Sequence, residues 1–308
     1  MELTEILKYL MIIFVEILLI ENTENMMIDE LPAGKSGGNI DLNMTALVGT
    51  NDILMLCFDT LRYDVAVSEE ASGGTPILSR YGKWEKRHAP GNFTYPSHFA
   101  MFAGFLPSPA EPHLLQDRQW LFFPMRVGSG NNAPSGSYPF HRATFVQSLE
   151  DDRYETICIG GVNFFSKKNE IGKVFPSYFK KSYWKPTFGC TSKDSAARQI
   201  EFAVEKLTTY SNNKRIFMYV NFSAIHYPNH HYVEGQKEDD LVSHAAALRY
   251  VDSQLPLLFD AFSKRGNTLV IALSDHGTCY GEDGYRYHCI SHENVYTVPY
   301  KHFMLKGK

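Results

Sequence analysis

Four continuous apolar runs, each the length of a buried strand, are spaced along the chain. They cover residues 53–58, 156–159, 215–220 and 268–273. An apolar run without polar alternation is typical of a strand that is buried on both faces of a sheet. Apolar patterns of helical period precede the last three runs, over residues 145–149, 195–207 and 243–262. Strands that alternate with helices predict an α/β fold with a mostly parallel central sheet and helices on both faces.

The amino end differs from the rest of the chain. Residues 9–20 are apolar apart from Glu16, which is shorter than the roughly 20 residues of a membrane-spanning helix. The first five residues include Glu2 and Glu5 and no basic residue, whereas a signal peptide begins with basic residues. We therefore expect residues 1–40 to be an amphipathic or poorly ordered extension, residues 41–308 to form the folded part of the chain, and the protein to be cytoplasmic.

Charge and cysteine content narrow the classes of partner. The net charge of −4 gives no electrostatic reason to expect nucleic acid or an anionic membrane as the main partner. The five cysteines are an odd number without close spacing, which does not resemble a disulfide framework or a zinc knuckle. We therefore expect neither nucleic acid nor a membrane as a partner.

Polar side chains follow three of the four apolar runs. Asp59 comes directly after the first run, His226 lies a few residues after the third, and Asp275 and His276 follow the fourth. Because the carboxyl ends of parallel strands meet at one edge of a sheet, ligands bind there. The sequence therefore predicts that three separate segments bring carboxylates and imidazoles to one site, as a bound metal ion requires.

A hydroxyl precedes a predicted helix between the first two runs. Thr94 stands just before Pro96, which suits the first turn of a helix, and the apolar pattern continues to Phe102 before Gly104. The start of a helix offers free N–H groups and the positive end of the dipole to the oxygens of a phosphate or sulfate ester. A metal ion would lower the pKa of the hydroxyl, so we predict that Thr94 is a nucleophile.

These segments resemble a known superfamily. Four stretches occur in the order and spacing of the alkaline phosphatase superfamily: Asp59-Thr60-Leu61-Arg62, Thr94-Tyr95-Pro96-Ser97-His98, His226-Tyr227-Pro228 and Ser274-Asp275-His276-Gly277. The chain is most similar to the sulfatase-like branch over about residues 43–303, and within it to compact bacterial sulfatase-like hydrolases whose genes lie beside radical-enzyme genes. The resemblance implies a sulfatase-like catalytic domain, with possible partner enzymes encoded nearby.

The resemblance also implies roles for individual residues. Asp59, Asp275 and His276 would bind a divalent metal, Thr94 would complete the metal site as the nucleophile, and His226 would contact the leaving group. A further group would bind substrate: His98, Arg62, His288 and His292. Arg62 has two alternative roles: it could brace the metal ligands, or it could form a surface salt bridge.

The chain departs from conventional sulfatases at three positions. Those enzymes oxidise a cysteine or serine to formylglycine, which the threonine at Thr94 cannot yield, and His98 replaces an arginine. Thr94 instead resembles the nucleophile of nucleotide pyrophosphatases and lipoteichoic acid synthases, which pass through a phosphothreonine. Thr60 stands where many sulfatases have a second aspartate. The mixed Asp and His set favours one Mn²⁺ or Zn²⁺ over Ca²⁺, which needs six to eight oxygen ligands.

Together these features predict a metal-dependent hydrolase or transferase of phosphate esters, most simply phosphodiesters, with a threonine nucleophile. Two alternatives remain open: a sulfatase that uses Thr94 directly, and a non-catalytic relative that binds metal or ligand. The lysine-rich segment 166–189 is either a solvated connection or a lid for an anionic substrate.

Overall fold

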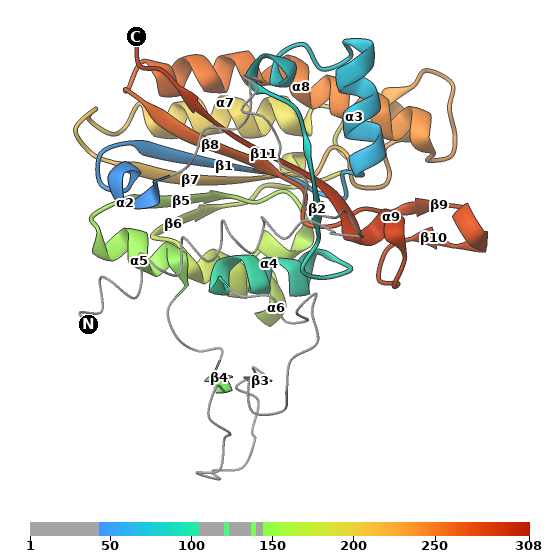
Figure 1. The fold of residues 1–308 in the computed structure, drawn as a ribbon, viewed down its shortest axis with the longest axis horizontal. Coiled ribbons are helices and arrows are strands. Elements are labelled where there is room, and N and C mark those ends of the chain that lie inside the picture. The colour runs from blue at the N-terminus through green and yellow to red at the C-terminus, as the bar shows by residue number, and fades with distance from the viewer. Residues whose placement is uncertain (1–42, 105–119, 123–136, 140–143) are drawn as a thin grey trace, which may run out of the picture.

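The structure is a computed structural model that describes residues 43–104, 120–122, 137–139 and 144–308. The extension predicted over residues 1–40 lies outside the described residues. A seven-stranded sheet with the order β2-β11-β8-β1-β7-β5-β6 forms the centre (Figure 1). Its strands are β1 (Asp52–Phe58), β2 (Glu85–His88), β5 (Glu155–Ile159), β6 (Lys181–Tyr183), β7 (Ile216–Phe222), β8 (Thr268–Leu273) and β11 (Thr297–Leu305).

The direction of the strands confirms the predicted mostly parallel sheet. The neighbours β8, β1, β7, β5 and β6 pair in parallel. Only β11 runs the other way among the seven strands, pairing antiparallel with both β8 and β2. The four predicted strands are β1, β5, β7 and β8, none of which is an edge strand of the sheet.

Helices cover both faces of the sheet, as predicted (Figure 1). One face carries α3 (Tyr63–Ser72), α7 (Ser195–Leu207) and α8 (Leu241–Ser263), and the other carries α4 (Thr94–Ala103), α5 (Phe145–Asp151) and α6 (Glu170–Val174). Side chains alternate along β1 between two cores. Leu54 and Leu56 pack in the core that includes α7 and α8, while Ile53 and Met55 pack in the core that includes α4 and α5. This alternation explains why the first run is apolar throughout.

Shorter elements connect the layers. Two small sheets pair β3 (Trp120–Phe122) with β4 (Ser137–Pro139) and β9 (Cys279–Tyr280) with β10 (Arg286–Tyr287). The remaining α-helices are α2 (Met44–Leu47) and α9 (Glu293–Tyr296). Short 3₁₀ helices are η1 (Leu78–Tyr81), η3 (Asn163–Phe165), η4 (Phe175–Tyr178), η5 (Pro186–Phe188), η6 (His230–Tyr232) and η7 (Glu282–Gly284).

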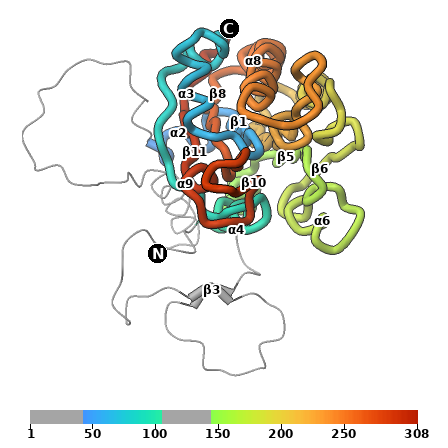
Figure 2. The backbone as a smooth tube through the Cα atoms, turned by 90° about the vertical axis from the view of Figure 1, so that its right-hand side faces the viewer, coloured from blue at the N-terminus to red at the C-terminus, as the bar shows by residue number. Residues whose placement is uncertain are grey.

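The segment between β8 and β11 returns across the carboxyl end of the sheet. It carries β9, β10 and α9, which Figure 2 shows beside the start of α4. The backbone N–H of Cys289 donates to the carbonyl of Asn92 at 2.8 Å, and this bond joins the segment to the loop before α4. Within the described part of the chain, no helix combines the length and apolar character that crossing a membrane requires.

Candidate active site and metal centre

The predicted metal ligands meet at the carboxyl edge of the sheet. Because β1 and β8 pair in parallel, the residues that follow them are neighbours. Asp59 follows β1, Asp275 and His276 follow β8, and all three are fully buried. The Nε2 atom of His276 lies 4.0 Å from Asp59 Oδ1 and 3.5 Å from Asp275 Oδ2. The structure therefore brings these residues together, with ligand atoms within 4.8 Å of one another.

A strained turn joins Asp59 to Asp275. Thr60 has φ 66°, a left-handed conformation that is a genuine outlier for a β-branched residue and costs on the order of 1–3 kcal/mol. This conformation lets the Thr60 N–H donate to Asp275 Oδ1 at 3.2 Å. The turn thus fixes one carboxylate relative to the other.

Hydrogen bonds within the protein orient the three side chains. Asn221 Nδ2 donates to Asp59 Oδ2 at 3.0 Å, and His276 Nδ1 donates to the Gly277 carbonyl at 2.9 Å. Asp59 Oδ1 and Asp275 Oδ2 are buried and have no hydrogen-bond partner among the described residues. Buried carboxylate oxygens without partners are costly, and a cation satisfies them. The oxygens and His276 Nε2 therefore fit a divalent metal with oriented ligands.

Burial shapes the protonation of this cluster. It raises the pKa of Asp59 to about 6, with the nearby Asp275 carboxylate contributing, and it raises the pKa of Asp275 to about 7. Burial lowers the pKa of His276, so this imidazole is neutral at neutral pH. Two carboxylates that resist ionisation beside a neutral imidazole form an acceptor-rich cluster suited to a positive ion.

Thr94 lies against the cluster as the first residue of α4. Its Oγ1 is 3.3 Å from His276 Nε2, and the side chain is buried. The chain approaches the helix closely at Gly91, where an added Cβ would come within 2.8 Å of the Ser97 backbone nitrogen. The helix predicted after Thr94 is present, and its start holds the hydroxyl beside the candidate metal ligands.

His98 is not placed as the resemblance implied. Its side chain is fully buried, Nδ1 donates to the Thr94 carbonyl at 2.7 Å, and Nε2 accepts from the Tyr219 hydroxyl. Both ring nitrogens are therefore engaged within the protein, which does not fit contact with substrate. His98 also clusters with Cys57 and Asp275, but its protonated Nδ1 has no lone pair for a cation and the lone pair of Nε2 is engaged by the Tyr219 hydroxyl. His98 instead holds the first turn of α4 against β7.

Arg62 and His292 both have interaction partners within the protein. Arg62 is buried, pairs with Asp64 at 2.6 Å, and contacts Glu282 in the segment after β9. This favours the alternative that it braces the structure around the metal ligands. His292 is the N-cap of α9, where its Nδ1 accepts from the Asn294 N–H at 3.1 Å. A capping role explains that histidine.

His226 and His288 are partly exposed residues beside the cluster. The His288 ring lies 4.6 Å from the His276 ring and 5.4 Å from the His226 ring. His226 Nδ1 donates to the Tyr227 carbonyl at 2.6 Å, which leaves Nε2 as an acceptor. Burial lowers the pKa of His226 and, together with His276 and His226, lowers that of His288 to about 3. Two neutral imidazoles therefore lie beside the cluster of Asp59, Asp275 and His276.

Sequence reasoning missed Asn221. It is fully buried near the end of β7, and its amide also accepts from the N–H groups of Gly161 and Val162 at 3.2 and 3.1 Å. The only signal in the sequence is an amide that interrupts an apolar strand. Its role depends on the parallel pairing that places Asn221 opposite Cys57, two residues before Asp59.

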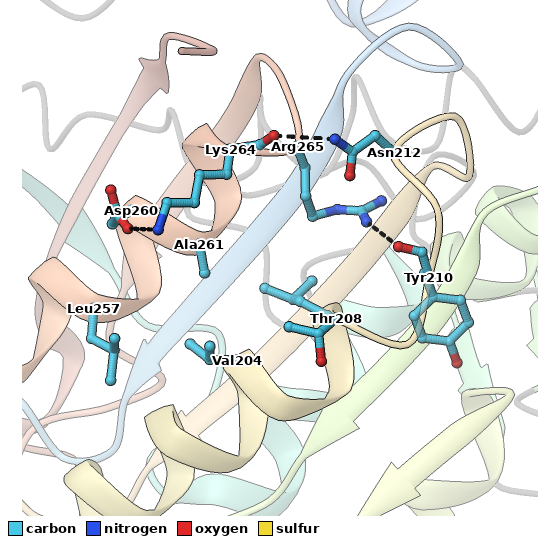
Figure 3. A pocket seen from close by; sticks show the side chains of 10 residues that line it. Val204, Thr208, Tyr210, Asn212, Leu257, Asp260, Ala261, Lys264 and Arg265 are labelled. Carbon is cyan, nitrogen blue, oxygen red and sulfur yellow. Dashed lines mark hydrogen bonds and ion pairs between the residues drawn. The ribbon is translucent and has the colours of Figure 1, made fainter.

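A separate surface pocket of about 320 Å³ lies between the carboxyl-terminal parts of α7 and α8 (Figure 3). Val204 and Leu257 line its apolar part, and Asp260 and Lys264 form an ion pair at its rim. These helix ends lead into the amino ends of β7 and β8, whereas the cluster lies beyond the carboxyl ends. The pocket therefore does not belong to the candidate active site.

The mostly parallel sheet and the sulfatase match identify the chain as a sulfatase-like member of the alkaline phosphatase superfamily. Residues 51–301 match the sulfatase family, so the chain belongs to that family and is an ester hydrolase or transferase of the sulfatase-like type. No curated protein has a significantly similar sequence.

Three solved structures share the fold at low identity. The periplasmic domain of phosphoethanolamine transferase EptC from Campylobacter jejuni has a TM-score of 0.54 and 14% identity, over 83% of this chain and 80% of that one. The lipoteichoic acid synthase LtaP from Listeria monocytogenes has a TM-score of 0.53 and 14% identity, over 83% and 66%. An alkaline phosphatase superfamily protein from Vibrio parahaemolyticus has a TM-score of 0.52 and 18% identity, over 84% and 61%.

Proposed function

We propose that the protein hydrolyses or transfers a phosphate ester, of the phosphodiester type, with Thr94 as the nucleophile. The observation that carries this proposal is the position of Thr94 Oγ1, 3.3 Å from His276 Nε2 at the start of α4. A threonine hydroxyl attacks phosphorus directly, whereas it cannot become the aldehyde of a conventional sulfatase. The names of two similar structures, a phosphoethanolamine transferase and a lipoteichoic acid synthase, support a phosphorus-containing ester.

Asp59, Asp275 and His276 would hold one divalent ion, with Thr94 completing the ligand set. Carboxylate and imidazole ligands together favour Mn²⁺ or Zn²⁺ over Ca²⁺. When bound, the ion would supply positive charge that makes the hydroxyl more acidic and offsets charge on the ester oxygens.

The protein's own groups account for the movement of protons and bonds. Thr94 Oγ1 attacks phosphorus, and the bond from phosphorus to the leaving oxygen breaks. His226 can accept the hydroxyl proton at Nε2 and deliver it to the leaving oxygen, because its Nδ1 proton is engaged by the Tyr227 carbonyl. Water or an acceptor alcohol then attacks the phosphothreonine, and the Thr94 hydroxyl is restored.

Replacing the nucleophile tests this function. In the full-length protein with added Mn²⁺ or Zn²⁺, Thr94→Ala is expected to reduce hydrolysis of bis(4-nitrophenyl) phosphate by about 1,000-fold or more. Thr94→Ser keeps a hydroxyl and is the matched control, expected to retain measurable turnover. Mass spectrometry of the quenched reaction would detect a 4-nitrophenyl phosphoryl group on Thr94, because only one of the two 4-nitrophenolate groups leaves when the adduct forms. Full turnover by Thr94→Ala would rule out the proposed nucleophile.

A sulfatase that uses Thr94 directly is the second candidate, favoured by the family match over residues 51–301. Esters with the same leaving group separate the two. Faster turnover of 4-nitrophenyl sulfate than of the corresponding phosphate mono- and diesters would replace our proposal with this one. Bound metal without turnover of any ester would favour a non-catalytic relative.

The cellular setting stays a prediction. A small anionic ester substrate, no nucleic-acid or membrane partner, and partner enzymes encoded nearby are expectations from the sequence. The expected cytoplasmic location receives no support from the similar EptC structure, which is a periplasmic domain.

A further inference from the structure

Two exposed tyrosines pack against each other beside the candidate active site. Tyr227 follows β7 and is 37% exposed, and Tyr287 ends β10 and is 42% exposed. Their ring centroids are 4.6 Å apart with planes inclined at 46°. We call these two residues the tyrosine pair. Large aromatic side chains that share an exposed position beside a reaction site offer ring surface to a ligand.

A continuous series of rings connects the tyrosine pair to the metal-ligand cluster. The Tyr227 ring stacks on His226 with centroids 4.2 Å apart, and it lies 5.6 Å from the His288 ring. His288 in turn lies 4.6 Å from His276. A group joined to an ester held at Thr94 would therefore pass along His226 and His288 to reach the tyrosine pair.

The backbone holds Tyr287 in an unusual conformation. Its φ is 68° and that of Cys289 is 69°, in the left-handed region that bulky residues rarely adopt. The pairing of Tyr287 with Cys279 across β9 and β10, and the Cys289 N–H bond to Asn92, hold the segment in place. Such strain persists where the surrounding structure imposes it, often at ligand sites.

We propose that the tyrosine pair binds a planar aromatic ring carried by the substrate. This inference rests on the proposed function, since it assumes that an ester occupies the site at Thr94. The rings nearest to the tyrosine pair are the imidazoles of His226 and His288, whose centroids lie 4.2 and 5.6 Å from that of Tyr227. The adjacent Arg286 has Glu238 at 3.9 Å as a counter-charge. Stacking on ring faces therefore determines recognition here, which selects an aryl group or a nucleobase over an aliphatic group.

Binding of matched phosphonates tests the tyrosine pair without requiring turnover. Phenylphosphonate and cyclohexylphosphonate have the same anionic group and similar size, but only the first has an aromatic ring. Their affinities would be measured by calorimetry with full-length Thr94→Ala protein saturated with Mn²⁺. A second pair, adenosine 5′-monophosphate and ribose 5-phosphate, distinguishes a nucleobase from a simple aryl group.

We expect phenylphosphonate to bind about 3- to 10-fold more tightly than cyclohexylphosphonate. Tyr227→Leu and Tyr287→Leu should remove this preference, while Tyr227→Phe should keep it. Tyr285→Leu is the matched control, because Tyr285 is 53% exposed on the same segment but lies by His292, with ring centroids 6.1 Å apart. It should leave the preference unchanged.

The outcomes separate this inference from the proposed function. An equal affinity for the aromatic and aliphatic ligands in both pairs, or a preference that survives both Tyr→Leu changes, would overturn the role of the tyrosine pair. A preference that depends on the pair in a protein that cleaves no phosphate ester would support the ring site and refute the proposed function. Ester cleavage without any preference for aromatic ligands would support the proposed function and refute the ring site.

Discussion

The two ends of β1 each bury an aspartate, but only one end supplies it with positive charge. At the amino end, Asp52 accepts from the Ile216 N–H at 2.9 Å and from the Arg265 guanidinium at 2.8 Å. At the carboxyl end, Asp59 lies near a second carboxylate, Asp275, and both have an oxygen without a hydrogen-bond partner in the described structure. One strand therefore contains a satisfied acidic residue and an unsatisfied acidic cluster.

The difference indicates what each end does. Arg265 also donates to the carbonyls of Tyr210 and Lys214, so the amino end is a closed network that joins α8 to the loop before β7 (Figure 3). At the carboxyl end, Asp59 Oδ1 and Asp275 Oδ2 have no partner in the described structure, so they can bind a cation. A buried pair that is complete supports the fold, whereas an incomplete one marks a binding site.

The largest expected effect comes from neutralising the two ends in turn. In metal-free protein at pH 8, Asp52→Asn should lower the free energy of unfolding by about 3 kcal/mol, because it leaves buried Arg265 without its partner. Asp275→Asn should instead raise it by about 2 kcal/mol. Native Asp275 has a raised pKa of about 7 and binds more protons than the unfolded chain, so its presence destabilises the protein increasingly as pH rises towards 7.

Urea unfolding in the presence of a chelator measures both changes. At pH 5, where the native Asp275 carboxyl is protonated, the gain from Asp275→Asn should shrink. If Asp52→Asn and Asp275→Asn lower the free energy of unfolding by equal amounts, the two ends of β1 do not differ as described.

Metal affinity should depend steeply on pH. Binding requires both carboxylates to lose their protons, and burial raises the pKa of Asp59 to about 6 and that of Asp275 to about 7. Affinity for Mn²⁺ should therefore fall by about 100-fold or more between pH 7 and pH 5, and change little above pH 8. Calorimetric titrations across this range measure the effect, with proton release near pH 6 as an independent sign. An affinity that is constant from pH 5 to pH 7 would show that these carboxylates are not the ligands.

A smaller effect should follow from removing a residue that orients a ligand. Asn221→Ala removes the N–H donor to Asp59 Oδ2 and should weaken Mn²⁺ binding by about 10- to 100-fold. Asn212→Ala is the matched control at the amino edge, where the Asn212 amide donates to the Lys264 carbonyl at 3.2 Å. It should leave metal affinity unchanged, while circular dichroism checks that both variants fold. Equal affinities in the two variants would refute the orienting role.

The sequence predicted β1, β5, β7 and β8, because a strand that is buried on both faces is a continuous apolar run. It did not predict β11, because Lys301 and His302 interrupt its apolar pattern. Lys301 is nevertheless fully buried, since its ammonium group donates to Glu70 at 2.8 Å and to the Gly82 carbonyl at 2.7 Å. These partners are distant in sequence, so only the tertiary structure reveals that a lysine can occupy this strand.

The candidate site likewise contains residues that the sequence predicted and residues that it could not predict. Asp59, Asp275 and His276 could be found because each follows a predicted strand, and parallel pairing determines where they meet. The position of His98 in a motif predicted contact with substrate. His98 lies one helical turn after Thr94 on the same side of α4, but its ring nitrogens bond to the Thr94 carbonyl and the Tyr219 hydroxyl. Tyr287 gave no sequence signal, because its position depends on a left-handed backbone conformation in a hairpin.

The measurement that tests the account most directly is a calorimetric titration of chelator-treated, full-length protein with Mn²⁺ and with Zn²⁺ at pH 7.5. We predict one binding site, lost in Asp275→Asn and retained in Asn212→Ala. If neither ion binds, or if Asp275→Asn binds as the unaltered protein does, the unsatisfied acidic cluster at the end of β1 is not a metal site.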